Sequence, residues 1–218
     1  MSNRHVLTLA LAAALVLGAA PVFATTLSVT NAAAITGSFG LEIDNTDAGV
    51  NPALVIQDDP GVINDETHVL MRVTAGNLLN FRTAVGNSRS FIAMQVQGRN
   101  PVIGNNKAVG RLYLISKNNR IRYRCHCRRN NGQARFCSAA SLPSGATTAT
   151  FEYEIFQQLG DGSTTSCSAT AVGFPTVSVN NVRNDITFFT GMRLGFVGSL
   201  NLPANQGVIH FDDFESFR

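Results

Sequence analysis

The sequence of 218 residues contains no tryptophan, three tyrosines and only 14% charged residues. The lack of tryptophan excludes indole platforms for the stacking of sugar rings. After residue 24, no stretch approaches the roughly 20 consecutive apolar residues that a membrane-spanning helix requires. We therefore expect no transmembrane anchor in the mature chain.

Acidic residues are missing from the middle of the chain. No Asp or Glu occurs in residues 67–151, whereas 13 of the 17 Lys and Arg residues lie in residues 72–135. All 14 acids lie in the flanks, at residues 42–66 and 152–215. One interpretation is a basic face that attracts a polyanion. The other, which we favour because a soluble surface needs both signs, is that acidic and basic strands lie side by side.

The first 24 residues, MSNRHVLTLALAAALVLGAAPVFA, have the composition of a secretory signal peptide. Arg4 gives a positive start, residues 6–20 carry no charge, and Ala24 ends a segment of small residues that a signal peptidase reads. We predict a cleavable signal peptide over residues 1–24 and a single domain over residues 25–218. The mature protein is then expected in the periplasm or outside the cell, and it is long enough for one hydrophobic core.

Apolar and polar residues alternate with period two along most of the remaining chain, which predicts β-strands rather than helices. Gly and Asn clusters at residues 104–106, 118–119, 130–132 and 160–162 predict the turns between them. This pattern predicts an all-β antiparallel sandwich, of the jelly-roll type. The expected strands are Phe39–Asp44, His68–Ala75, Ser90–Gln97, Val109–Ser116, Arg120–Cys127, Ala134–Ala139, Ala149–Gln157, Ser166–Val172, Met192–Gly198 and Val208–Phe217.

Both ends of the mature chain resemble one family of exported proteins. The segment ITGSFGLEI and the tail MRLGFVGSLNLPANQGVIHFDDFESFR resemble the opening strand and the last hairpin of bacterial secreted proteins with concanavalin A-like jelly rolls, which include laminin-G-like and glucanase-like domains. The resemblance covers residues 35–43 and 191–218. It implies a single structural calcium ion held by Asp213 of the last strand and by carbonyl groups near Gly40.

Residues 120–137, RIRYRCHCRRNNGQARFC, contain three of the four cysteines. On a strand, one face would carry Arg120, Arg122, Arg124, His126 and Arg128, and the other Ile121, Tyr123, Cys125 and Cys127. A zinc site is disfavoured because the histidine would point away from the cysteines. We predict two disulfides, in which Cys125 and Cys127 pair with Cys137 and Cys167 in either combination.

The row of arginines is the predicted ligand-binding surface, formed by Arg120, Arg122, Arg124 and Arg128. Like charges on one face repel unless acids or a bound anion oppose them. We favour Glu152 and Glu154 from a neighbouring strand as their partners. The alternative is a groove for an anionic glycan, because guanidinium groups suit carboxylate and sulfate oxygens. No specific nucleic-acid partner is predicted, because few aromatic residues accompany the basic segment.

The sequence predicts no active site. Glu152 and Glu154 in FEYEIF lack the third acid of the glucanase pattern, and Glu42 with Asp44 matches it no better. We expect His126 to be a solvated strand residue. The sequence thus predicts a non-catalytic, exported binding domain for extracellular or cell-surface carbohydrate. The alternatives are a structural or protein-interaction component of the envelope and, more weakly, a degenerate glycan hydrolase or lyase.

Overall fold

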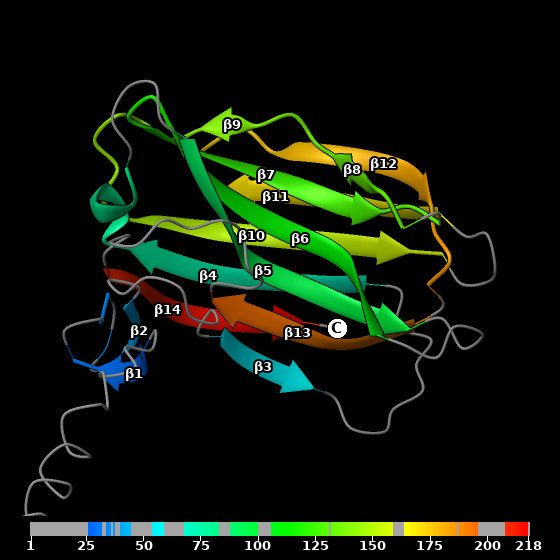
Figure 1. The fold of residues 1–218 in the computed structure, drawn as a ribbon, viewed down its shortest axis with the longest axis horizontal. Coiled ribbons are helices and arrows are strands. Elements are labelled where there is room, and N and C mark those ends of the chain that lie inside the picture. Colours follow the sequence, from blue (N-terminus) through cyan, green and yellow to red (C-terminus); the bar gives the residue numbers. More distant parts are fainter. Residues whose placement is uncertain are drawn as a thin grey trace, which may run out of the picture.

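The computed structural model describes residues 26–31, 34–35, 37, 40–44, 54–58, 68–82, 88–99, 106–130, 132–158, 164–186, 188–195 and 208–217. These residues form two antiparallel β-sheets, which lie one over the other in Figure 1. A short 3₁₀ helix, η1 (Leu78–Phe81), follows one of the strands. The architecture is the jelly-roll β-sandwich with two disulfides that the sequence predicted.

Each sheet mixes strands that are distant in the sequence. In spatial order the first sheet contains β1 (Thr26–Thr30), β2 (Gly40–Asp44), β14 (Val208–Phe217), β4 (His68–Gly76), β10 (Ala149–Gln157), β11 (Thr164–Ala171) and β12 (Val177–Arg183). The second sheet contains β3 (Leu54–Asp58), β13 (Phe188–Gly195), β5 (Ser88–Arg99), β6 (Asn106–Lys117), β7 (Arg120–Arg128) and β8 (Ala134–Phe136), and β9 (Ala140–Ser141) also pairs with β7. All ten predicted strands are present. Ala149–Gln157 and Val208–Phe217 have the predicted bounds, and the other eight have shifted ends. The strands β1, β3, β9 and β12 were not predicted.

The core lies between the sheets, because alternation turns one face of each strand inward. Tyr153 of β10 is fully buried and crosses this core to donate a hydrogen bond from its hydroxyl to the backbone oxygen of His126, at 3.0 Å. Gly110 of β6 makes room for it, because a Cβ at this position would collide with the Tyr153 hydroxyl. The Tyr153 contact therefore fixes β7 relative to the opposite sheet.

The turn between β6 and β7 confirms one sequence prediction. Asn118 and Asn119 both adopt left-handed backbone conformations, with φ angles of 51° and 57°, between the paired residues Lys117 and Arg120. Asparagine tolerates this region better than most residues, and two such residues make a type I′ hairpin turn. The predicted turns at 104–106 and 160–162 lie wholly or largely outside the described residues.

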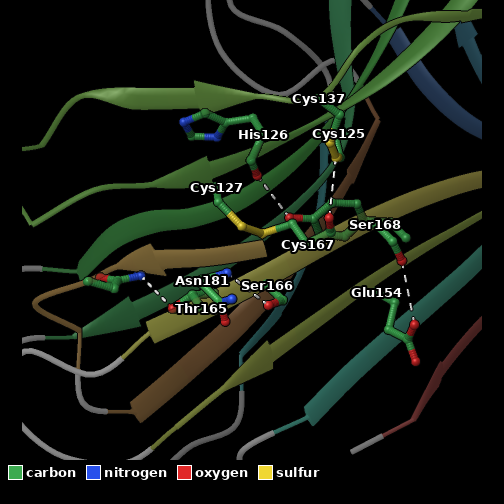
Figure 2. The surroundings of a disulfide bond; sticks show 12 residues. Cys125, His126, Cys127, Cys137, Glu154, Thr165, Ser166, Cys167, Ser168 and Asn181 are labelled. Carbon is green, nitrogen blue, oxygen red and sulfur yellow. Dashed lines mark hydrogen bonds between the residues drawn. A yellow bond between two sulfur atoms is a disulfide. The ribbon is translucent and has the colours of Figure 1, made fainter. Parts of the chain in front are cut away.

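The two disulfides have different positions. Cys127–Cys167 joins β7 to β11 and so links the two sheets, with a Cα–Cα distance of 5.9 Å. Cys125–Cys137 links β7 to the residue that follows β8, with a Cα–Cα distance of 5.3 Å. Both distances suit a disulfide. Figure 2 shows Cys127 turned toward Cys167, whereas His126 points away from the bond.

Two predictions concern the ends of the domain. The predicted signal peptide over residues 1–24 lies entirely outside the described residues, and the single-domain boundary stays a prediction. Among the residues that are described, none forms a helix long and apolar enough to cross a lipid bilayer.

Candidate functional site

A row of polar side chains crosses the outer face of the second sheet. Arg193 of β13 lies opposite Gln95 of β5, and Gln95 lies opposite Arg111 of β6. Arg111 lies opposite His126 of β7, which in turn lies opposite Phe136 of β8. Residues directly opposite one another on neighbouring strands share a face of the sheet. We call Arg193, Gln95, Arg111, His126 and Phe136 the cross-strand row.

A β-bulge brings Gln95 into this row. The register between β5 and β6 shifts between Ile92 and Met94. Phe91 and Met94 consequently both belong to the core between the sheets, whereas Ile92 packs with Tyr113 in a separate outer cluster. The extra residue resets the alternation, so that Gln95 joins the outer face.

Hydrogen bonds connect the centre of the cross-strand row. The Nε atom of Arg111 donates to Oε1 of Gln95 at 2.8 Å, and its Nη1 donates to the hydroxyl of Tyr113 at 3.3 Å. The ring of Tyr113 lies edge-on to that of His126, with 6.3 Å between their centroids. One guanidinium, one amide, one phenol and one imidazole therefore converge on the same patch of the sheet.

Several donors on this face lack protein partners. The Nε atoms of Arg122, Arg124 and Arg193 and the Nδ1 atom of His126 are buried, and none of them makes a hydrogen bond within the described part of the chain. Buried polar atoms without partners are rare in native proteins because each one costs free energy. Three of these four atoms belong to guanidinium groups, which suit the oxygens of a bound anion.

His126 is not the solvated strand residue that the sequence predicted. Its side chain is only 5% exposed, because Phe136 of the edge strand β8 lies beside it, with ring centroids 5.3 Å apart. Burial, followed by the charges of Arg111, Arg124 and Arg128, lowers the pKa of His126 to about 4. The imidazole is therefore neutral at neutral pH and is able to accept a proton.

The arginine row is not neutralised by the acids that we favoured. Glu152 and Glu154 lie on β10 of the first sheet, where they contact Arg72 at 3.1 Å and His68 at 2.9 Å. Figure 2 shows Glu154 and His126 pointing away from each other, from different strands. The interpretation of interleaved charges is thus wrong for this face: the basic middle segment builds most of the second sheet.

The arginines of β7 divide into two groups. The predicted alternation is correct, since Ile121, Tyr123, Cys125 and Cys127 are all buried in the core. Arg122 and Arg124 lie on the outer face beside the cross-strand row, where they face Ile115 and Tyr113. Arg120 is exposed at the hairpin end of β7, and Arg128 is ion-paired with Asp185 at 3.3 Å. Their role in ligand binding stays a prediction.

The calcium ion expected at Asp213 and Gly40 also stays a prediction. Asp213 is exposed and sits in a bulge of β14 with a φ angle of 52°. Its neighbour Asp212 accepts a hydrogen bond from the backbone amide of Ile35 at 2.8 Å. No cluster of three or more metal-ligating side chains occurs among the described residues.

Comparisons with known proteins show the fold. No family model matches the chain, and no curated protein matches its sequence. The endo-β-1,4-glucuronan lyase from the fungus Trichoderma reesei is similar in structure, with a TM-score of 0.54, 13% identity, and 88% of this chain and 86% of that chain covered. The calreticulin globular domain of T. cruzi gives a TM-score of 0.55 at 11% identity, with 88% and 79% covered. The alginate lyase from Aplysia kurodai gives 0.48 at 12% identity, with 88% and 87% covered.

These findings contradict the prediction of a non-catalytic carbohydrate-binding domain without enzymatic activity. The jelly-roll fold of this chain is shared over 88% of its length with a polysaccharide lyase. The prediction of no enzymatic activity was wrong because it was based on the lack of the paired carboxylates that glycoside hydrolysis requires. The face that collects functional groups instead carries guanidinium, amide, phenol and imidazole groups.

Sequence reasoning also missed four members of the site. Gln95, Arg111, Tyr113 and Arg193 lie on three different strands, and only strand pairing brings them to His126. One signal was available: Arg111 and Tyr113 alternate with apolar residues on a predicted strand next to the CHC hairpin. The register of that hairpin, set by its two-residue turn, would have placed both beside β7.

Proposed function

We propose that the protein is a polysaccharide lyase, which cleaves a chain containing uronic acids by β-elimination on the outer face of the second sheet. The observation that carries this proposal is the convergence of Arg111, Gln95, Tyr113 and His126, with unpartnered guanidinium atoms around them. The fold shared with a glucuronan lyase supports it.

Elimination from a uronate needs a group that binds the carboxylate, a base and an acid, and the proposed site supplies all three. A base takes the proton from C5, next to the carboxylate; the electron pair forms the C4–C5 double bond; and the C4–O4 bond breaks as the leaving oxygen gains a proton. Arg111 and Gln95 bind the carboxylate, whose negative charge grows in the transition state, so that these donors stabilise the transition state more than the ground state.

His126 and Tyr113 perform the proton transfers. The neutral imidazole of His126 accepts the C5 proton, and the hydroxyl of Tyr113 supplies a proton to O4. A bound substrate carboxylate offsets the guanidinium charges that lower the pKa of His126, and so raises this pKa toward the working pH when substrate binds. The site therefore gains a stronger base as it fills.

Export to the periplasm or the outside of the cell is part of this proposal. Two disulfides persist most readily in an oxidising compartment, where a polysaccharide substrate is also accessible.

The proposed function is tested on polyglucuronate, alginate and a neutral β-1,4-glucan by following the ultraviolet absorbance of the new double bond. We expect absorbance to rise with a polyuronate and not with the neutral glucan. His126→Gln and Tyr113→Phe should each lower kcat by roughly 10²-fold or more, because each removes a proton-transfer group.

Glu152→Gln, on the opposite sheet, is the matched control and should keep its activity. Two results would overturn the proposal: no absorbance change with any polyuronate, or an activity that survives in both His126→Gln and Tyr113→Phe.

A further inference from the structure

Phe136 is a large apolar side chain in an unusual place. It is 42% exposed and ends β8, an edge strand of three residues that are all exposed. Its ring covers the guanidinium of Arg124, at 4.1 Å from the ring centroid, and its centroid is 5.7 Å from that of Tyr113. An exposed aromatic residue thus stands at one end of the cross-strand row, beside the proton-transfer groups.

The strand β8, which carries this ring, is attached to the sheet over a short length. It pairs with β7 over three residues, from His126 to Arg128. The next residue, Cys137, is buried, forms the disulfide with Cys125, and donates its backbone amide to the carbonyl of Cys125 at 3.1 Å. Cys125 lies between Arg124 and His126, so the disulfide anchors the strand directly beneath the Phe136 ring.

We propose that Phe136 is a stacking platform for a sugar ring of the substrate, and that the Cys125–Cys137 disulfide is a positioning element that holds the platform over Arg124 and His126. The inference rests on the proposed function, because it assigns Phe136 to the same polyuronate site. A flat apolar face stacks on the C–H groups of a pyranose while the neighbouring guanidinium binds its carboxylate. This assigns to phenylalanine the task that tryptophan, absent from this chain, performs in many sugar sites.

A fluorescence experiment tests the platform without relying on catalysis. The chain has no tryptophan, so Phe136→Trp introduces a single indole at the proposed contact. Titration with saturated glucuronate oligosaccharides should change its emission with a saturable dependence on concentration. Phe156→Trp is the matched control, because Phe156 is 49% exposed on β10 of the first sheet. The emission of an indole at this position should not change when the oligosaccharide is added.

Steady-state kinetics then separate binding from chemistry. Phe136→Leu should raise KM roughly three- to tenfold, the value of one aromatic contact, and should lower kcat far less than His126→Gln does. Phe136→Tyr, which keeps an aromatic ring, should have the wild-type KM. A lyase whose KM is the same in wild type and Phe136→Leu, and whose Phe136→Trp emission ignores the oligosaccharide, would overturn this inference and leave the proposed function standing. A saturable change in Phe136→Trp emission without any elimination activity would support the sugar platform and overturn the proposed function.

The positioning role of the disulfide is tested by removing each bond separately. Cys125→Ala/Cys137→Ala should raise KM as Phe136→Leu does, and adding Phe136→Leu to it should cause little further rise, because both changes remove one contact. Cys127→Ala/Cys167→Ala should lower the melting temperature while KM stays at the wild-type value. Equal effects of the two pairs on KM would show that neither bond positions Phe136.

Discussion

At the scale of single residues, His126 departs most from what its sequence context predicts. A histidine on the polar face of a strand is ordinarily solvated, and here it is nearly fully buried beside guanidinium groups that lower its pKa. Its Nδ1 atom has no hydrogen-bond partner within the described residues. Such an arrangement disfavours stability and suits a base that must remain neutral until substrate arrives.

The lowered pKa of His126 predicts how stability depends on pH. The unfolded chain binds a proton at His126 near pH 6.5, whereas the folded protein does so only near pH 4. Between these values the unfolded state holds more protons, so the free energy of unfolding falls as the pH is lowered through this window, by up to about 3 kcal/mol. Urea denaturation at pH 7 and at pH 4 measures the fall.

His126→Gln supplies the comparison, because glutamine does not titrate. The fall in the free energy of unfolding from pH 7 to pH 4 should be smaller in this variant than in wild type. An identical fall in both proteins would show that His126 titrates normally in the folded state.

At the scale of elements, the parts that follow from local sequence were predictable. Alternation located β7 and β10, and the Asn118–Asn119 turn fixed the β6–β7 hairpin. The cross-strand row was not predictable, since it depends on the bulge in β5 and on the pairing of β13 with β5, which are far apart in the sequence. The predicted turn at residues 130–132 correctly returns β8 alongside β7. The local pattern did not predict that this pairing sets Phe136 against His126 and helps to bury it.

The contact between sheets beneath the site depends on Gly110. A methyl group at this position would collide with the Tyr153 hydroxyl, which is fully buried and hydrogen-bonded to the backbone of His126. Gly110→Ala should therefore lower the free energy of unfolding by about 1–3 kcal/mol, measured by chemical denaturation. Gly145→Ala is the matched control, because a Cβ at Gly145 meets no atom within 4 Å. Equal stability of the two variants would contradict this packing.

At the scale of the whole molecule, the two sheets divide the charge. The acids whose side chains the structure describes lie on β2, β10 and β14 of the first sheet, apart from Asp185, which pairs with Arg128. The second sheet presents the cross-strand row together with Arg122 and Arg124. One face of the sandwich is thereby positive, as a surface that attracts an extended polyanion should be.

The central claim is that this positive face breaks its polymer by elimination. The mass of the oligosaccharides released from polyglucuronate tests it most directly, because elimination adds no water and hydrolysis adds one molecule for each bond broken. We predict products that carry an unsaturated uronate at the new non-reducing end and are lighter by one water than the hydrolytic oligomers. Fully hydrated products, or an intact polymer after prolonged incubation with the folded, disulfide-bonded protein, would contradict the account.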